Sequence, residues 1–163
     1  IGDLPALIDI VGEDKQSYEC PPQSEYQKER RKGSDAIYNN HGTIHDAKTK
    51  KFIAMVPEGK NYKSLPPEYD GIYKYHEALT RYHSKKPSPT INTGHRSHFH
   101  YKWNRIPTVR ESARLQSFDD TFIFFGNKTQ QYRQVGNAVP PLLGKAIAIE
   151  IMKWLDERYG EES

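Results

Sequence analysis

The residues after Pro140 set the strongest limit on what this chain can fold into. Pro140 and Pro141 precede apolar residues at helical spacing, and prolines are tolerated in the first turn of a helix. The pattern predicts a terminal helix with a wide apolar face, which comprises Leu142, Leu143, Ala146, Ile147, Ile149, Met152 and Leu155. Such a face must pack against another layer of structure.

The composition makes a self-sufficient core difficult to build. Only 35% of the 163 residues are hydrophobic and 28% are charged, and the mean hydropathy is −0.90. Nineteen aromatic residues nevertheless argue against a disordered tail. We therefore expect a folded chain with long polar loops, whose terminal helix is covered by a partner or by a second copy of the chain.

Local signals indicate three further elements. Residues 51–56 read as a strand that ends at Pro57, and residues 57–61 read as a tight turn in which Gly59 adopts positive φ. Thr108 with Glu111 three residues later has the spacing of a capping box, which predicts a helix from Thr108 to about Ser117.

The basic residues are concentrated in one segment of the chain. The net charge is only +3, but no acidic residue occurs between Arg81 and Arg105. A basic stretch inside a nearly neutral protein is typical of a surface that faces phosphate groups. A solvated loop with scattered lysines is the alternative interpretation.

The single cysteine, Cys20, excludes an internal disulfide and fits a reducing compartment such as the cytoplasm. No apolar run approaches the roughly 20 residues of a membrane span, so we expect no membrane partner. The chain starts at Ile1 without an initiator methionine, which suggests a fragment or a processed chain.

Two motifs near the C-terminus identify a family. Residues 108–118 read TVRESARLQSF and residues 134–141 read QVGNAVPP, the latter interpreted as a loop that enters a helix. Both resemble the last two motifs of the DNA cytosine-5 methyltransferases, in that family's order and with about its spacing. Asp119 stands where the family usually has a proline.

This resemblance implies roles for both motifs. Asn137 and Ala138, with Val139 packing behind them, would close one side of the pocket for the cofactor S-adenosylmethionine. Gly136 would give that segment backbone freedom. In the first motif, Arg110, Glu111, Arg114 and Gln116 would brace a recognition domain against a catalytic domain. From spacing alone, the three charged members could form ion pairs with one another, which contribute little if exposed.

The resemblance also implies contact with double-stranded DNA through the major groove. Base contacts typically come from Arg, Lys, Asn or Gln, whereas most other basic residues meet phosphate. The residues that we expect at the DNA are Gly59, Lys60, Asn61, Arg81, His95 and Arg96.

The motifs that perform the family's chemistry are missing from these residues. The family uses a Cys in a Pro-Cys-Gln turn to attack C6 of a flipped cytosine, together with Glu-Asn-Val, Gln-x-Arg-x-Arg and Gly-rich cofactor motifs. Cys20 is followed by Pro21, so its order is wrong. We therefore assign no catalytic residue and expect a catalytic half as partner, either a separate subunit or preceding sequence.

Three histidines, His95, His98 and His100, lie close together in the basic segment. Structural zinc sites need four ligands, usually including cysteines, and no cysteine is near. We therefore expect no metal, and we expect contacts with base or phosphate or packing among the neighbouring aromatic residues.

The expected fold is α/β in two unequal parts. Residues 1–12 would end the catalytic domain, and residues 13–86 would form a small target recognition domain of strands and loops. Residues 87–163 would return to a doubly wound methyltransferase domain. The implied function is target recognition in cytosine C5 methylation within a bacterial cell, compatible with restriction–modification. A non-enzymatic DNA-binding or interaction module that retains the fold is the alternative.

Overall fold

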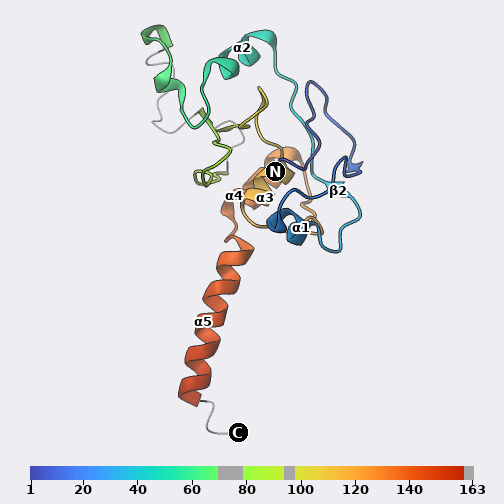
Figure 1. Cartoon of the computed structure of the whole chain (residues 1–163), viewed down its shortest axis with the longest axis vertical. Helices are drawn as coiled ribbons and strands as arrows, with labels where there is room; N and C mark the ends of the chain where they lie inside the picture. Colours follow the sequence, from blue (N-terminus) through green and yellow to red (C-terminus); the bar gives the residue numbers. More distant parts are fainter. Residues whose placement is uncertain (70–78, 94–97, 160–163) are drawn as a thin grey trace.

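The computed structural model describes residues 1–69, 79–93 and 98–159. Short elements joined by long loops form a body from which the last helix projects (Figure 1). The helices are α1 (Glu25–Arg31), α2 (Ala47–Met55), α3 (Val109–Leu115), α4 (Lys128–Asn137) and α5 (Pro141–Tyr159), with 3-10 turns at Tyr62–Ser64 and Pro67–Tyr69. The strands are β1 (Lys15–Gln16), β2 (Ile37–Tyr38), β3 (Thr80–Arg81) and β4 (His98–Phe99).

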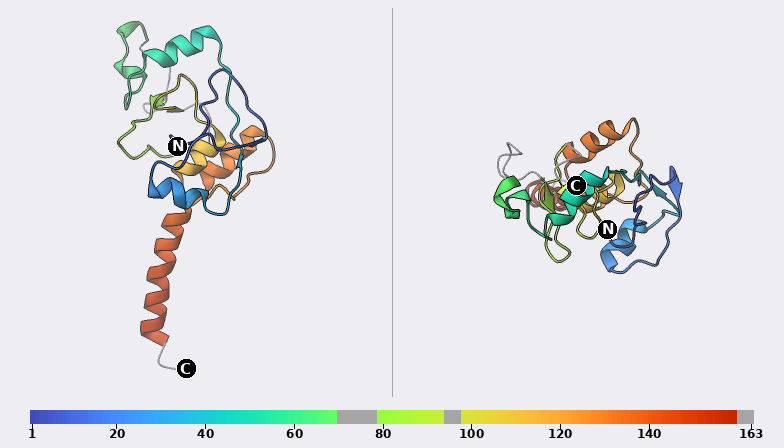
Figure 2. Two further views of the ribbon diagram at one scale, coloured as in Figure 1. Left: turned by 45° about the vertical axis from the view of Figure 1, so that its right-hand side comes forward. Right: turned by 90° about the horizontal axis from the view of Figure 1, so that it is seen from above.

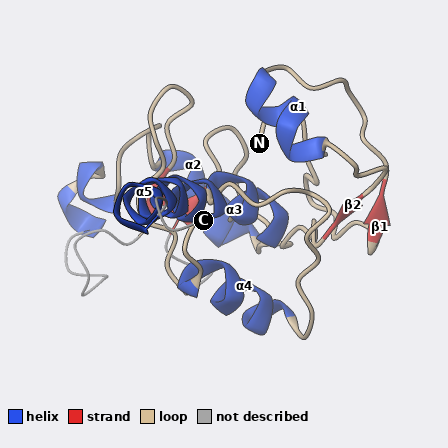
Figure 3. Cartoon of the chain, turned by 90° about the horizontal axis from the view of Figure 1, so that it is seen from below, coloured by secondary structure: helices blue, strands red, loops and turns tan. Residues whose placement is uncertain are grey.

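The strands form two small sheets in the part of the chain that is described. Strands β1 and β2 are antiparallel, with Lys15 opposite Tyr38. Strands β3 and β4 are parallel, with Thr80 opposite His98. Seen from below in Figure 3, α3 lies between α1 and α4, with the β1–β2 sheet to the right of α3. Helix α3 is therefore central to the body.

Two apolar clusters form the core. The first lies where α3 packs on α4 and comprises Tyr82, Ile91, Val109, Ala113, Phe118, Phe124, Tyr132 and Val135. The second lies beneath α2 and comprises Ile53, Val56, Tyr62, Leu79, Phe99 and Ile106. Each cluster takes residues from both sides of the predicted boundary at residue 86, and the domain boundaries remain a prediction.

The prediction of a strand at residues 51–56 is wrong, because residues 51–55 are the end of α2 and Val56 is its C-terminal cap. The Asp46 side chain caps this helix by accepting hydrogen bonds from the Thr49 amide (2.8 Å) and hydroxyl (2.9 Å). Ile53 and Val56, three residues apart, share the buried face of the helical turn. Pro57 still ends the element, since the residue before a proline disfavours the helical conformation.

The predicted capping box of α3 is confirmed. The Thr108 hydroxyl accepts from the Glu111 amide, and the Glu111 carboxylate accepts from the Thr108 amide. The helix ends at Leu115, two residues before the predicted end. Ser117 then adopts a φ of 65°, which turns the chain away.

The segment predicted as a loop at residues 134–141 is helical as far as Asn137, which is the last residue of α4. Gly136 does not have positive φ, so the expected conformational freedom of glycine is not needed at this position. A Cβ atom at Gly136 would lie 2.6 Å from main-chain atoms of Asn92 and Thr93. The position therefore requires glycine because two pieces of backbone approach closely.

Helix α5 is confirmed, and none of its residues is buried. It extends away from the rest of the chain in Figure 1 and in the left view of Figure 2. The predicted apolar face is also exposed in this chain: Leu143, Ile147 and Met152 are each half or more exposed, as are the neighbouring Ile151 and Trp154.

Candidate nucleic-acid interface

Helix α3 carries charged side chains that are almost completely buried. Arg114 is 1% exposed and donates to both carboxylate oxygens of Asp120, at 2.5 Å each. A second carboxylate, that of Asp3, lies 3.3 Å from Arg114 Nη1. Burial by itself would lower the pKa of Arg114, but the bonds to Asp120 and the charge of Asp3 raise it overall.

Glu111 is the anionic counterpart on the same helix. It accepts a two-pronged interaction from Arg105 at 2.7 and 2.8 Å and is 1% exposed. Burial opposes its ionisation, yet the hydrogen bonds and charge of Arg105 lower the pKa of Glu111 overall. Arg105 also donates to the Ala6 carbonyl, which ties α3 to the first residues of the chain.

Arg110 bonds mainly to main-chain oxygen. Its guanidinium donates to the carbonyls of Tyr38 (2.9 Å), Asp119 (3.0 Å) and Phe122 (2.6 Å), and burial lowers the pKa of this side chain. Gln116 donates from Nε2 to the Val135 carbonyl at 2.6 Å, which joins the end of α3 to α4.

The local ion-pair network that the spacing of Arg110, Glu111 and Arg114 suggested is therefore not what forms, because these buried side chains pair with other residues. Two of their partners, Asp3 and Tyr38, are far away in the sequence. Others lie closer along the chain and include Arg105, Asp119, Asp120 and Phe122. Asp3, Arg105 and Asp120 are the residues of this network that sequence reasoning missed. Only the two consecutive aspartates after Phe118 gave a signal, because an acidic pair so close to Arg114 can fold back onto it.

His100 lies beside this network with its side chain 2% exposed. Its Nδ1 atom accepts hydrogen bonds from the amides of Lys102 (3.1 Å) and Trp103 (3.0 Å), so it must be unprotonated there. Burial lowers the pKa of His100 to about 4, although the nearby Glu111 carboxylate acts in the opposite direction.

This geometry predicts a loss of stability in mild acid. The unfolded chain takes up a proton at His100 near its ordinary pKa of 6.5, whereas the folded chain does so near 4. Unfolding is therefore favoured as the pH falls from about 6.5 towards 4, and we expect a loss of about 1 kcal/mol between pH 7 and 5.5. Urea denaturation at both pH values measures it.

The matched control is His100→Asn, which keeps an acceptor near the same amides but does not titrate. Its free energy of unfolding should change much less over the same pH interval. An equal pH dependence in both proteins would show that His100 is not the responsible group.

The predicted turn at residues 57–61 is present. Gly59 has a φ of 70°, and its amide donates to the Arg81 carbonyl at 3.1 Å. The side chain of Lys60 is exposed, and Asn61 caps the following 3-10 turn by accepting from the Lys63 amide. Gly59 and Lys60 are therefore accessible, as a DNA contact requires.

Arg81 is placed differently from the expectation. It is 5% exposed, and its guanidinium donates to the carbonyls of Ile53 (2.5 Å), Val56 (2.7 Å) and His100 (2.9 Å). This placement argues against the predicted direct contact with DNA, because the donors are occupied within the protein. His95 and Arg96, the other predicted contacts in this segment, lie outside the described residues.

The predicted cofactor-closing residues connect α4 to α5. Asn137 is exposed at the end of α4, Ala138 is half-buried, and Val139 is 63% exposed. Val139 therefore does not pack behind its neighbours in this chain, contrary to the expectation.

Cys20 does not occupy a built site. It is half-buried, and its nearest polar partner is the Asp3 carbonyl, 3.6 Å from Sγ. Within the described ranges, no group of three or more His, Cys, Asp or Glu side chains is arranged to hold a metal ion. The predicted absence of metal remains a prediction, since His95 is not among those residues.

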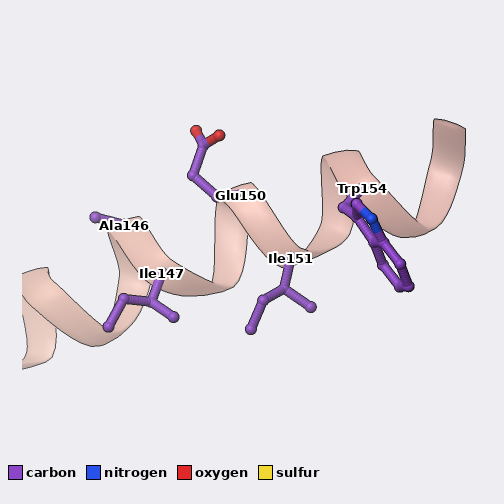
Figure 4. A pocket seen from close by; sticks show the side chains of 5 residues that line it. All are labelled: Ala146, Ile147, Glu150, Ile151 and Trp154. Atoms are coloured by element: carbon purple, nitrogen blue, oxygen red, sulfur yellow. The ribbon is translucent and has the colours of Figure 1, made fainter.

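The exposed face of α5 is apolar over several turns. Figure 4 shows Ile147, Ile151 and Trp154 on one side of the helix and Glu150 on the opposite side. By length and composition alone, the stretch Lys128–Tyr159 is apolar enough to cross a membrane, although residues 138–140 interrupt the helix. The predicted absence of a membrane partner is therefore still a prediction.

Comparison with known proteins gives consistent matches over nearly the whole chain. The sequence profile of the C-5 cytosine-specific DNA methylase family matches residues 6–153. The type II methyltransferase M.DdeI of Desulfomicrobium norvegicum is 35% identical over 96% of this chain and 42% of its own length. The type II methyltransferase M1.HphI of Haemophilus parahaemolyticus is 41% identical over 74% of this chain and 33% of its own length.

The chain spans less than half the length of these relatives. A solved structure from an E. coli prophage, assigned as a DNA modification methyltransferase, matches with a TM-score of 0.71 and 23% identity. The match covers 94% of this chain and 45% of that one. This similarity concerns the fold, and it confirms the predicted α/β class.

Proposed function

Because this chain belongs to the C-5 cytosine-specific DNA methylase family, we propose that it is the DNA-recognising part of such an enzyme. The observation that carries the proposal is the match over residues 6–153, within which no Pro-Cys-Gln turn occurs. The nucleophile would come from a catalytic portion, either a separate subunit or further sequence of the same protein.

The recognition role rests on the turn at residues 57–61. Gly59 and Lys60 are exposed at its tip, and a glycine with positive φ lets the backbone approach a ligand closely. Lys60 carries a mobile cation, and Asn61 carries an amide, both suited to phosphate or base edges. His95 and Arg96 extend this proposal along the sequence.

The cofactor role rests on the link between α4 and α5. Members of this family use S-adenosylmethionine, which supplies the methyl group when bound. An exposed amide at Asn137 beside a small and an apolar side chain suits one wall of a pocket for a ligand with polar and aromatic groups. The remaining walls would belong to the catalytic portion.

Helix α3 supports the assignment of DNA recognition and of cofactor binding to two separate regions of the chain. Its buried charges bond to residue 3, to residues 38 and 39, and to residues 105 and 120, so it joins segments on both sides of the predicted recognition domain. Arg110, Glu111, Arg114 and Gln116 would thus brace the parts and take no part in the chemistry. We place the activity in the cytoplasm of a bacterial cell, at the nucleoid, within restriction–modification.

The apolar face of α5 would pack on the catalytic portion. A helix with large apolar side chains around most of its surface is normally covered on more than one side. The relatives are more than twice as long as this chain, so the missing part is large enough to cover it. A second copy of the chain is the competing occupant.

Methyl transfer from labelled S-adenosylmethionine to mixed-sequence DNA tests the proposal. We expect no transfer by this chain alone or by the catalytic portion alone, and transfer when the two are mixed. Transfer by this chain alone would overturn the assignment and implicate Cys20. DNA binding without transfer in any mixture would favour the non-enzymatic module.

A further inference from the structure

The main chain of Arg81 is hydrogen-bonded to the turn that carries Lys60. The Gly59 amide donates to the Arg81 carbonyl at 3.1 Å, and the Arg81 amide donates to the Lys60 carbonyl at 2.9 Å. The position of Lys60 is therefore fixed relative to β3, to which Arg81 belongs. Glu58, the carboxylate of the same turn, accepts from the Ser84 amide and lies 3.9 Å from His83.

The side chain of Arg81 joins two further pieces of the fold. Its guanidinium donates to the carbonyls of Ile53 and Val56 at the end of α2, where the helix dipole presents partial negative charge. It also donates to the Trp103 carbonyl (3.3 Å) and to Asn104 Oδ1 (2.9 Å). Among the described residues it forms no ion pair with a carboxylate.

The second piece is a tight turn at residues 100–104 that carries another exposed cation. His100 Nδ1 accepts from the amides of Lys102 and Trp103, which fixes the backbone of the turn. Lys102 is exposed, and its Nζ lies 4.5 Å from the centre of the Trp103 ring. A cation beside an aromatic ring is a combination that suits a nucleic-acid backbone and its sugars.

We propose that Arg81 is a positioning residue that holds the turns at 57–60 and 100–104 in one surface for the DNA backbone. Lys60 and Lys102 each neutralise a phosphate on this surface, and Arg81 itself does not touch DNA. The absence of acidic residues between Arg81 and Arg105 leaves the second turn free of opposing charge along the sequence. This inference rests on the proposed function, because it specifies how the recognition part meets its DNA.

The salt dependence of DNA binding tests the two cations. In the assembled methyltransferase, the dissociation constant for duplex DNA is measured from 50 to 300 mM salt for Lys60→Ala, Lys102→Ala and the control Lys28→Ala. Lys28 is an exposed lysine of α1 that pairs with Glu25. Removing one interaction between a lysine and a phosphate reduces the slope of log K against log[salt] by about one. We expect that reduction for Lys60→Ala and Lys102→Ala but not for Lys28→Ala.

Arg81 is tested by a pair of substitutions. Arg81→Met should reduce the slope by about two, because both turns lose their fixed position. Arg81→Lys should restore part of the loss, since its ammonium can still bond to the end of α2. If Arg81→Met no longer unfolds cooperatively, its DNA binding is not interpretable. Lys102→Ala then tests the inference, because it removes only an exposed side chain.

Two outcomes separate this inference from the proposed function. If the wild-type protein binds DNA and Lys102→Ala has the wild-type slope, the second turn does not contact phosphate and the inference is overturned. If the assembled wild-type protein does not bind DNA, the proposed function itself fails.

Discussion

Replacement of Arg114 by Met should lower the free energy of unfolding by about 3–5 kcal/mol, the usual cost of breaking a buried ion pair from one side. Arg114 is the shared cation of Asp3 and Asp120, and both carboxylates have no exposed side-chain surface. Met fills most of the volume but donates no hydrogen bond. Asp120 would keep the Tyr18 hydroxyl, whose pKa burial and this bond raise to about 12, and the more distant guanidinium of Arg110, 3.8 Å away.

Urea denaturation followed by circular dichroism measures this loss. The matched control is Arg133→Met, because Arg133 is exposed on α4 and its loss should change stability by less than about 0.5 kcal/mol. The double variant Arg114→Met, Asp120→Asn should recover part of the loss, since one uncompensated charge is removed. Equal stabilities of Arg114→Met and Arg133→Met would show that the buried network contributes nothing.

Substitution of Gly136 by Ala should destabilise the chain by about 2–3 kcal/mol through overpacking. The added Cβ would lie 2.6 Å from the carbonyl carbon and oxygen of Asn92 and from the amide nitrogen of Thr93. These are main-chain atoms, which cannot rotate away as the tip of a side chain can. Helix α4 and the segment at residues 92–93 would have to separate.

Gly144→Ala is the control for this substitution, because no atom lies within 4 Å of the Cβ it would add. Replacing a glycine inside a helix by alanine normally stabilises by about 0.5–1 kcal/mol. The two variants should therefore shift the midpoint of thermal unfolding in opposite directions. A shift in the same direction would mean that α4 can move away from residues 92–93 without cost.

Local sequence signals predict those helices whose caps and apolar repeat lie within or next to the helix itself. The side chains of Thr108 and Glu111 each accept a hydrogen bond from the other residue's backbone amide. The start of α3 can therefore be predicted from four consecutive residues, without knowledge of the fold. The prolines before α5 and its helical repeat are local in the same sense. The strand prediction for residues 51–56 fails because the apolar residues there fit both the helical and the strand periodicity, while the helix start is set by the cap at Asp46, outside that stretch.

The candidate site was predictable only where it lies on the surface. The turn at Gly59 follows from its own residues, and its exposure leaves it available to a ligand. The burial of Arg81 could not be read from the sequence, because its partners are carbonyls of α2 and of residues 100 and 103. The bond between Arg114 and Asp3 spans 111 residues, and no local pattern indicates such a pair.

The bare apolar helix α5 has a consequence for how a cell handles the chain. Large side chains such as Trp154 and Met152, which are 50% and 56% exposed, are what chaperones and quality-control proteases detect in unfinished proteins. A copy of the chain with α5 uncovered would be held by chaperones or degraded by proteases. The abundance of this chain would then follow the supply of whatever covers this helix.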